Sequence, residues 1–102
     1  MPARMTALDP AKRCTLVAVL LALRGGKSMP QRALASAAGI SEPTVARMRP
    51  SLVAAGIIYV REEPSDREAP VTWHALTPRG EQAADHAAAM RALFLGGPLR
   101  AA

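Results

Sequence analysis

The pattern of apolar positions is clearest between residues 31 and 58, where two short stretches with helical periodicity flank a glycine. The apolar residues recur there at spacings of three and four, as one face of a helix requires: Leu34 and Ala38 before the glycine, then Val45, Met48 and Leu52. Gly39 supplies the positive φ that a sharp turn between helices needs. Ser41 is placed to cap the second helix, about 42–55, and Pro43 is tolerated in its first turn. The segment therefore predicts a helix-turn-helix, with a kink or an early end at Pro50.

A wider apolar face is predicted for a helix that precedes this segment. Asp9-Pro10 is a typical helix start, and Gly25-Gly26 is a typical end. The apolar residues between them are Leu16, Val17, Val19, Leu20, Leu21 and Leu23, which is more than a surface helix needs. The remaining side is a stripe of small residues: Ala11, Thr15, Ala18 and Ala22. This stripe is either buried under the C-terminal helix of the same chain or forms a dimer contact.

The second half of the chain predicts two strands and a final helix. β-Branched and aromatic residues mark strands at 57–62 and 71–76, joined by a polar tip at 63–70. Residues 27–29 are expected to form a short extended connector with one or two strand residues. Thr77-Pro78 opens a helix over 78–95, whose apolar stripe is Ala83, Ala87, Met90 and Phe94, and Gly96-Gly97-Pro98 ends it.

These elements define a mainly α fold with a small β-hairpin, in the order helix, helix, turn, helix, hairpin, helix. That order is the order of a winged helix-turn-helix. We expect a flexible N-terminal arm at 1–8, the winged domain at 9–77, a helix at 78–95 available for dimerisation, and a tail at 96–102. The length of 102 residues suits one small core.

Charge is concentrated on the helix-turn-helix segment and the residues next to it. The net charge is +5, and residues 24–61 carry six positive side chains against one negative, which also gives +5. A polyanionic partner fits this placement. Because only three residues are aromatic, a stacking platform for single-stranded nucleic acid is not expected. The hairpin tip has the opposite character, with Glu62, Glu63, Asp66 and Glu68 against Arg67.

The single cysteine, Cys14, allows no internal disulfide and no zinc-ligand spacing, so a reducing cytoplasm is expected. We expect no membrane span either, because the apolar run at 16–23 is too short. Within an apolar helix, Cys14 is interpreted as inert core, with a redox role as the alternative. His74 and His86 are interpreted as ordinary hydrogen-bonded histidines. We expect no enzyme activity, no metal site and no cofactor.

Between residues 28 and 82 the chain resembles bacterial transcription regulators of the MarR and PadR groups. The resembling residues are Leu34-Ala35, Gly39-Ile40-Ser41, Thr44-Val45, Leu52, Ala55-Gly56-Ile57-Ile58, Asp66-Arg67 and Leu76-Thr77-Pro78-Arg79-Gly80. The resemblance implies a dimer that places the second helix of the turn motif in the major groove and uses the hairpin as a wing. MarR-like chains have longer flanking helices than this one, so a small-molecule effector pocket is doubtful here.

If Val45, Met48 and Leu52 face the core, the opposite side of the helix reads DNA. That side carries the residues expected to contact bases: Pro43, Thr44, Arg47 and Ser51. Arg47 is the first choice, because arginine bonds guanine through two parallel donors; a phosphate contact is the alternative. The residues expected at the DNA backbone are Lys27, Ser28, Gln31, Arg32, Ser41, Arg61 and Arg67. A salt bridge within the tip is the alternative for Arg67, and Arg49 is expected to pair inside the protein.

The sequence thus predicts a sequence-specific regulator of double-stranded DNA, acting as a homodimeric repressor. The residues expected at the dimer interface are Ala11, Thr15, Ala18, Ala22, Ala83, Ala87, Met90 and Phe94. Two alternatives stay open: a winged-helix module that binds proteins through its acidic wing, and an architectural or plasmid-maintenance protein that binds DNA with broad specificity.

Overall fold

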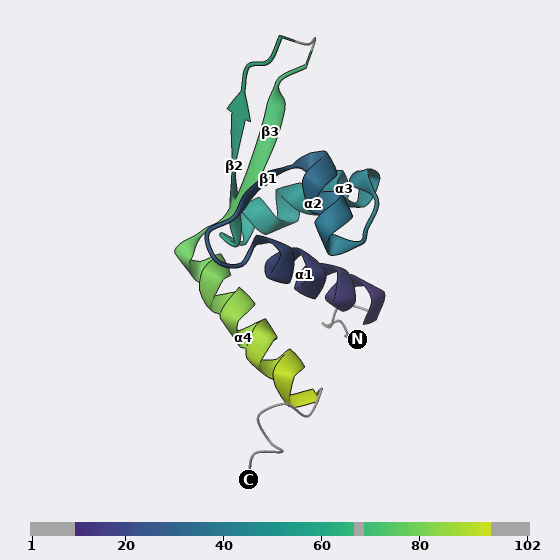
Figure 1. Ribbon diagram of the computed structural model, residues 1–102, viewed down its shortest axis with the longest axis vertical. Helices are drawn as coiled ribbons and strands as arrows, with labels where there is room; N and C mark the ends of the chain where they lie inside the picture. The colour runs from purple at the N-terminus through teal and green to yellow at the C-terminus, as the bar shows by residue number, and fades with distance from the viewer. Residues whose placement is uncertain (1–9, 67–68, 95–102) are drawn as a thin grey trace, which may run out of the picture.

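A computed structural model describes residues 10–66 and 69–94, which form four helices and three strands (Figure 1). In chain order the elements are α1 (Pro10–Leu23), β1 (Ser28–Pro30), α2 (Gln31–Ala38), α3 (Glu42–Ala54), β2 (Ile58–Glu63), β3 (Val71–Leu76) and α4 (Pro78–Phe94). The predicted mainly α fold with a hairpin is confirmed, and the boundaries differ from the predicted ones by one or two residues. The expected arm at 1–8 and the tail at 96–102 lie outside the described residues.

The strands form one antiparallel sheet in the order β1-β3-β2. In β3, His74 is paired with Met29 of β1 on one side and with Val60 of β2 on the other. The connector at 27–29 was expected to hold one or two strand residues, whereas β1 has three and completes a third strand. Pro30 is compatible with this strand because β1 is an edge of the sheet, where a missing N–H costs no ladder bond.

Pro50 does not end the second helix of the turn motif early, contrary to one of the two expected outcomes. α3 continues past it to Ala54. Proline removes only its own N–H bond, and the backbone bond from the Ala55 N–H to the Ser51 carbonyl oxygen, 3.0 Å long, closes the helix beyond it.

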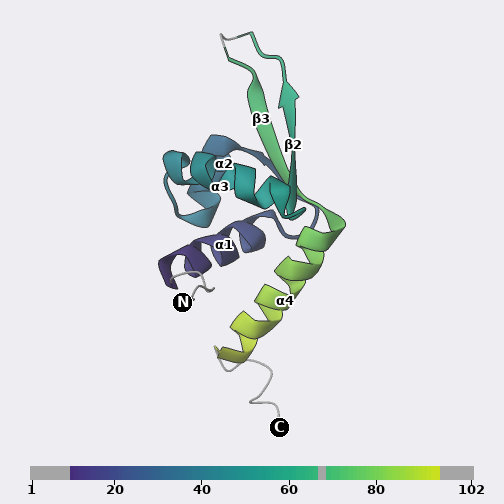
Figure 2. The same cartoon turned by 180° about the vertical axis from the view of Figure 1, so that it is seen from behind.

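The core is built where α1 meets the two helices of the turn motif and the base of the sheet. Its buried aliphatic residues come from every helix and from two strands: Val19, Leu20, Leu23, Leu34, Ala35, Val45, Ile58, Leu76 and Ala84. Met48 and Leu52 pack against this cluster, as their spacing predicted. Figure 2 shows α1 lying between the α2–α3 pair and α4, a central position that agrees with its wide apolar face.

The turn between α2 and α3 has the predicted geometry. Gly39 adopts φ +71°, and its N–H bonds to the Ser36 carbonyl oxygen at 3.2 Å. The Ser41 hydroxyl accepts the Thr44 N–H at 3.2 Å, which satisfies one of the free amides at the start of α3. The Gly39 turn and the Ser41 cap therefore fix the angle at which α3 leaves the turn.

α4 begins in close contact with the start of β2. The Thr77 hydroxyl accepts the Gly80 N–H at 3.0 Å and donates toward the Gly56 carbonyl oxygen at 2.5 Å. The Thr77 N–H bonds to the Ile57 carbonyl oxygen at 3.0 Å. These bonds explain the Leu-Thr-Pro-Arg-Gly motif as a structural joint. α4 leaves this joint on the side of the sheet away from the hairpin tip (Figure 1). Among the described helices, none is long and apolar enough to cross a membrane.

Candidate nucleic-acid interface

One face of α3 is exposed and polar, opposite the buried side chain of Val45. Pro43, Arg47 and Ser51 are exposed on it, and Thr44 is partly buried. The hydroxyls of Ser41 and Thr44 lie 2.7 Å apart, and Arg47 donates from Nη2 to the Thr44 hydroxyl at 3.3 Å. The Arg47 side chain thus lies along its own helix, held by a single long hydrogen bond to Thr44. Replacing this acceptor by another one costs little free energy.

The residues expected at the DNA backbone divide into three groups. Lys27, Ser28, Arg32, Ser41 and Arg61 are exposed. Gln31 is partly buried, and both ends of its amide bond within the protein, to Arg49 and to Glu42. Arg67 lies outside the described residues. In the exposed group, Ser41 bonds to Thr44 and Arg61 pairs with Glu63, and Gln31 would also have to give up an internal bond to meet a phosphate.

Arg49 is bound inside the protein, as predicted. Its Nε donates to His74 Nε2 at 3.0 Å, and its Nη2 donates to the Gln31 side-chain oxygen. The long-range partners were not predicted, because residue spacing along one helix says nothing about a strand residue 25 positions away.

The base of the wing contains a polar cluster around Trp73. Arg61 stacks over the indole ring, 5.9 Å from its centroid, and the indole N–H donates to Glu63 at 3.2 Å. Glu63 also pairs with Arg61 at 3.5 Å. Trp73 therefore contacts two residues of the neighbouring strand β2. An ion pair this exposed is weak, so Arg61 can leave it at small cost.

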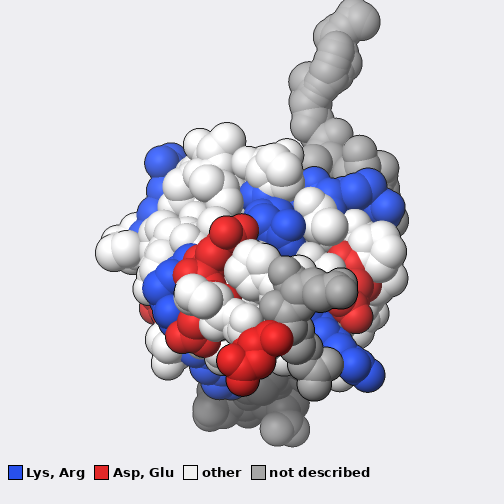
Figure 3. Space-filling view, turned by 90° about the horizontal axis from the view of Figure 1, so that it is seen from above, with Lys and Arg blue, Asp and Glu red and all other residues white. Residues whose placement is uncertain are grey.

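The described part of the tip is acidic and exposed, with Glu62, Glu63 and Asp66. Viewed from the hairpin end, acidic side chains gather around the middle of the face, and lysine and arginine lie at separate places around them (Figure 3). Lysine and arginine thus form separate patches on the visible part of this face rather than one continuous patch. Phosphate contacts are expected beside the wing rather than at its acidic tip.

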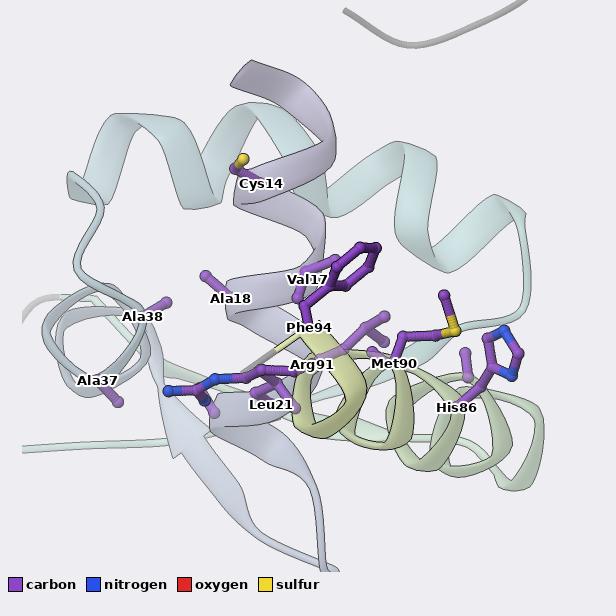
Figure 4. Close-up of a pocket in the computed structure, with 14 residues that line it drawn as sticks. Cys14, Val17, Ala18, Leu21, Ala37, Ala38, His86, Met90, Arg91 and Phe94 are labelled. Atoms are coloured by element: carbon purple, nitrogen blue, oxygen red, sulfur yellow. The ribbon is translucent and has the colours of Figure 1, made fainter. Parts of the chain in front are cut away.

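An apolar groove of about 1090 Å³ lies among α1, α2 and α4 (Figure 4). Its lining includes Val17, Ala18, Leu21, Ala38, Met90 and Phe94. Phe94 is 82% exposed, and Val17 and Met90 are also exposed. Large apolar side chains exposed together mark a surface that binds another apolar surface.

Cys14 also lines this groove and is exposed, so its interpretation as inert core was wrong. The apolar face of α1 is wide enough that its buried side could not be chosen from sequence. Packing selected Val19, Leu20 and Leu23, and this choice turns Cys14 outward.

The eight residues expected at a dimer interface are not all equally accessible. Ala22 packs against the core of its own chain, which supports the burial alternative for this residue of the stripe, and Ala83 and Ala87 of α4 pack against the same core. Met90 and Phe94 are exposed, whereas Thr15 and Ala18 are partly buried. The side chain of Ala11 lies outside the described part of the chain.

α4 is tied to the end of α1 by polar contacts that sequence reasoning missed. The Glu81 carboxylate accepts the N–H groups of Gly25 and Gly26 at 3.1 and 2.8 Å, and Arg24 pairs with Asp85 at 2.8 Å. The sequence carried no local signal for these contacts, because they join residues 55 to 61 positions apart along the chain. Among the described residues, no cluster of three histidine, cysteine or acidic side chains could hold a metal ion.

No protein-family model matches the chain, and no curated protein matches it. The chain is, however, similar to several solved structures. A MarR family transcriptional regulator from Silicibacter pomeroyi has a TM-score of 0.62 and 22% identity, over 78% of this chain and 54% of that one. The adhesin competence repressor of Streptococcus pyogenes has a TM-score of 0.67 and 23% identity, over 84% and 62%. A transcriptional repressor, CouR, bound to a 23-mer DNA duplex, has a TM-score of 0.60 and 28% identity, over 84% and 56%.

The fold is thus the winged helix found in MarR family regulators. The MarR side of the resemblance is supported by these structures, and the PadR side stays a prediction. The chain spans only a little over half the length of the first of these neighbours.

Proposed function

We propose that this protein is a sequence-specific regulator that binds double-stranded DNA as a homodimer and represses transcription. The observation that carries the proposal is the exposed polar face of α3, with Arg47 at its centre, on a fold shared with a repressor that binds a DNA duplex. A helix presented in this way on a winged fold fits the major groove.

In this proposal α3 reads bases between Ser41 and Ser51. Arg47 exchanges its bond to Thr44 for the two acceptors of a guanine, a contact worth about 1–3 kcal/mol of discrimination between bases. Pro43, Thr44 and Ser51 lie on the same face and contact neighbouring base edges or sugars. Lys27, Ser28, Arg32 and Arg61 bind phosphates, and Ser41 contributes its hydroxyl while it caps the helix.

The dimer forms through the groove walls of α1 and α4. Phe94 and Met90 extend beyond the core of their own chain, and they cover the apolar groove of the other copy together with Ala18 and Thr15. Repression follows because a dimer held on two half-sites occupies the DNA that the transcription machinery needs. The proposal includes no small-molecule effector.

Selection of bound duplexes from a random pool tests the proposal. We expect a palindromic site, because a two-fold dimer reads two equal half-sites. Arg47→Ala is expected to weaken binding to the selected site about tenfold or more, while Arg79→Ala, which removes the same charge from exposed α4, is the matched control. No enrichment over random duplex would exclude specific reading and leave the broad-specificity alternative.

The acidic wing favours one alternative of a different class, a module that binds a basic protein surface through Glu62, Glu63 and Asp66. A salt titration separates the two. Several phosphate contacts require affinity for DNA to fall steeply as salt rises, and the absence of salt-sensitive DNA binding would favour the protein-binding module.

A further inference from the structure

His74 lies at the centre of the sheet and is completely buried, with 0% of its surface exposed. Its Nδ1 lies 3.0 Å from the Met29 carbonyl oxygen, in the neighbouring strand β1. A carbonyl oxygen only accepts, so Nδ1 carries the proton of this bond. The other ring nitrogen, Nε2, is therefore an unprotonated acceptor in the neutral ring.

That acceptor holds the recognition helix. Arg49 of α3 donates from Nε to His74 Nε2 at 3.0 Å, and the same guanidinium donates to the Gln31 side chain of α2. The Gln31 amide nitrogen then donates to Glu42 at 3.3 Å, in the first turn of α3. One chain of hydrogen bonds therefore runs from the central strand to both the middle and the start of α3.

A protonated imidazole could not keep this arrangement. Both of its nitrogens would be donors, and Nε2–H would then face the N–H of a guanidinium that does not give up its proton. Arg49 is the charged group that α3 brings to the ring. The sheet contributes the Met29 carbonyl on one side and apolar Val60 on the other, and α2 contributes the neutral amide of Gln31, with Glu42 one bond further away.

The pKa of His74 is lowered from its ordinary value of 6.5, chiefly because burial disfavours the charged ring, and the positive charge of Arg49 acts in the same direction. The bond to the Met29 carbonyl oxygen opposes this shift. The neutral ring is thus the form that the folded protein maintains at neutral pH.

We infer that His74 and Arg49 are positioning residues for α3, and that a proton on His74 releases α3 from the sheet and weakens its binding to DNA. This inference rests on the proposed function. It gives the domain a sensitivity to acid that lies outside the DNA-contacting face, because Arg49 points into the protein while Arg47 points out.

The test measures affinity for a duplex recovered in the selection, at about pH 7.5 and about pH 5.5. Added protons normally strengthen DNA binding, because they add positive charge. We expect the opposite in the wild-type protein, a fall of about tenfold, as loss of a hydrogen bond to a charged group is worth about that factor. His86→Gln, which removes the other histidine, is expected to keep the fall, and His74→Gln is expected to abolish it. A fall that survives in His74→Gln, or no fall in wild type, would overturn the inference.

Because His74 is buried, His74→Gln could fail to fold, and Arg49→Gln provides a second variant. Without the guanidinium, protonation of the ring no longer opposes a positive charge, so the fall in affinity should shrink. Nitrogen NMR of wild type without DNA gives an independent readout. We expect the ring proton on Nδ1, and amide signals of α3 that shift together as the ring titrates. If the ring proton of His74 lies on Nε2 instead, or if the α3 amide signals do not shift as the ring titrates, the positioning role is refuted.

The two proposals fail in different ways. A protein that enriches no duplex lacks the proposed function, yet its NMR spectra still decide whether His74 positions α3. A protein that binds its site with the same affinity at both pH values keeps the proposed function and loses this inference.

Discussion

A Cβ atom placed on Gly80 would lie 2.0 Å from the carbonyl oxygen of Ile57, so the first turn of α4 lies against the backbone that leads into β2. The two segments cannot separate without breaking the bonds that Thr77 makes to residues 56 and 57. The joint therefore fixes α4, and with it the groove, relative to the wing.

Gly80→Ala is expected to destabilise the protein by about 3 kcal/mol, because backbone rather than a flexible side chain opposes the new methyl group. Urea unfolding measures the effect. Gly39→Ala is the comparison, since a Cβ there meets nothing within 4 Å and suffers only from the positive φ, at about 1–2 kcal/mol. Equal losses in the two variants would contradict the close approach.

Glu81→Gln is expected to cost about 1 kcal/mol of unfolding free energy, because the neutral amide accepts the N–H groups of Gly25 and Gly26 less strongly than a carboxylate does. Asp85→Asn should cost less than about 0.5 kcal/mol, since its ion pair with Arg24 is largely in solvent. Thermal unfolding of both variants shows which one loses more unfolding free energy. A larger loss in Asp85→Asn would show that the ion pair contributes more to the contact between α1 and α4.

Phe94→Glu is expected to weaken dimerisation at least about tenfold, because it places a charge on the most exposed large apolar side chain of the groove. Sedimentation equilibrium gives the dimer dissociation constant. Tyr59→Glu, at an exposed aromatic on β2, is the control and should leave that constant unchanged. A dimer that tolerates Phe94→Glu would exclude this groove as the interface.

Arg32→Ala should weaken binding to all duplexes alike and reduce the slope of log affinity against log salt by about 1, as expected for one lost phosphate contact. Arg47→Ala should instead relax the choice of base at one position. Competition between the selected site and single-base variants distinguishes the two results. A loss of base selectivity in Arg32→Ala would assign that arginine to a base.

Unfolding free energy should depend on pH through His74. Because the folded pKa lies below 6.5, the unfolded chain binds this proton more readily. The contribution of His74 is therefore complete above pH 6.5 and is lost as the pH falls through the folded pKa, with a slope of at most about 1.4 kcal/mol per pH unit. Urea unfolding of wild type and His74→Gln between about pH 7.5 and about pH 5 should show a smaller loss in the variant.

Local chemistry made most of the fold predictable. Ser41 and Gly39 make their cap bonds to residues only three or four positions away, so the turn and the cap could be predicted from the sequence. The face of α3 was predictable for the same reason, since Val45 and Met48 define it by spacing alone.

Contacts between distant segments were not predictable in this way. The pairing of Arg49 with His74, and of Glu81 with the glycines after α1, depends on how the elements pack. Cys14 was wrongly predicted to be buried, because α1 has more apolar positions than the core can bury. Packing, and not periodicity, decides which of them face inward.

β2 is also an outer strand of the sheet, and its outer edge pairs with no other strand among the described residues. An open strand edge invites a strand from another molecule, and proteins oppose this with charge and with proline. Arg61, Glu62 and Glu63 are consecutive on β2, and Pro64 follows at once. The hairpin charges are therefore expected to oppose edge-to-edge aggregation, a role that requires no nucleic acid.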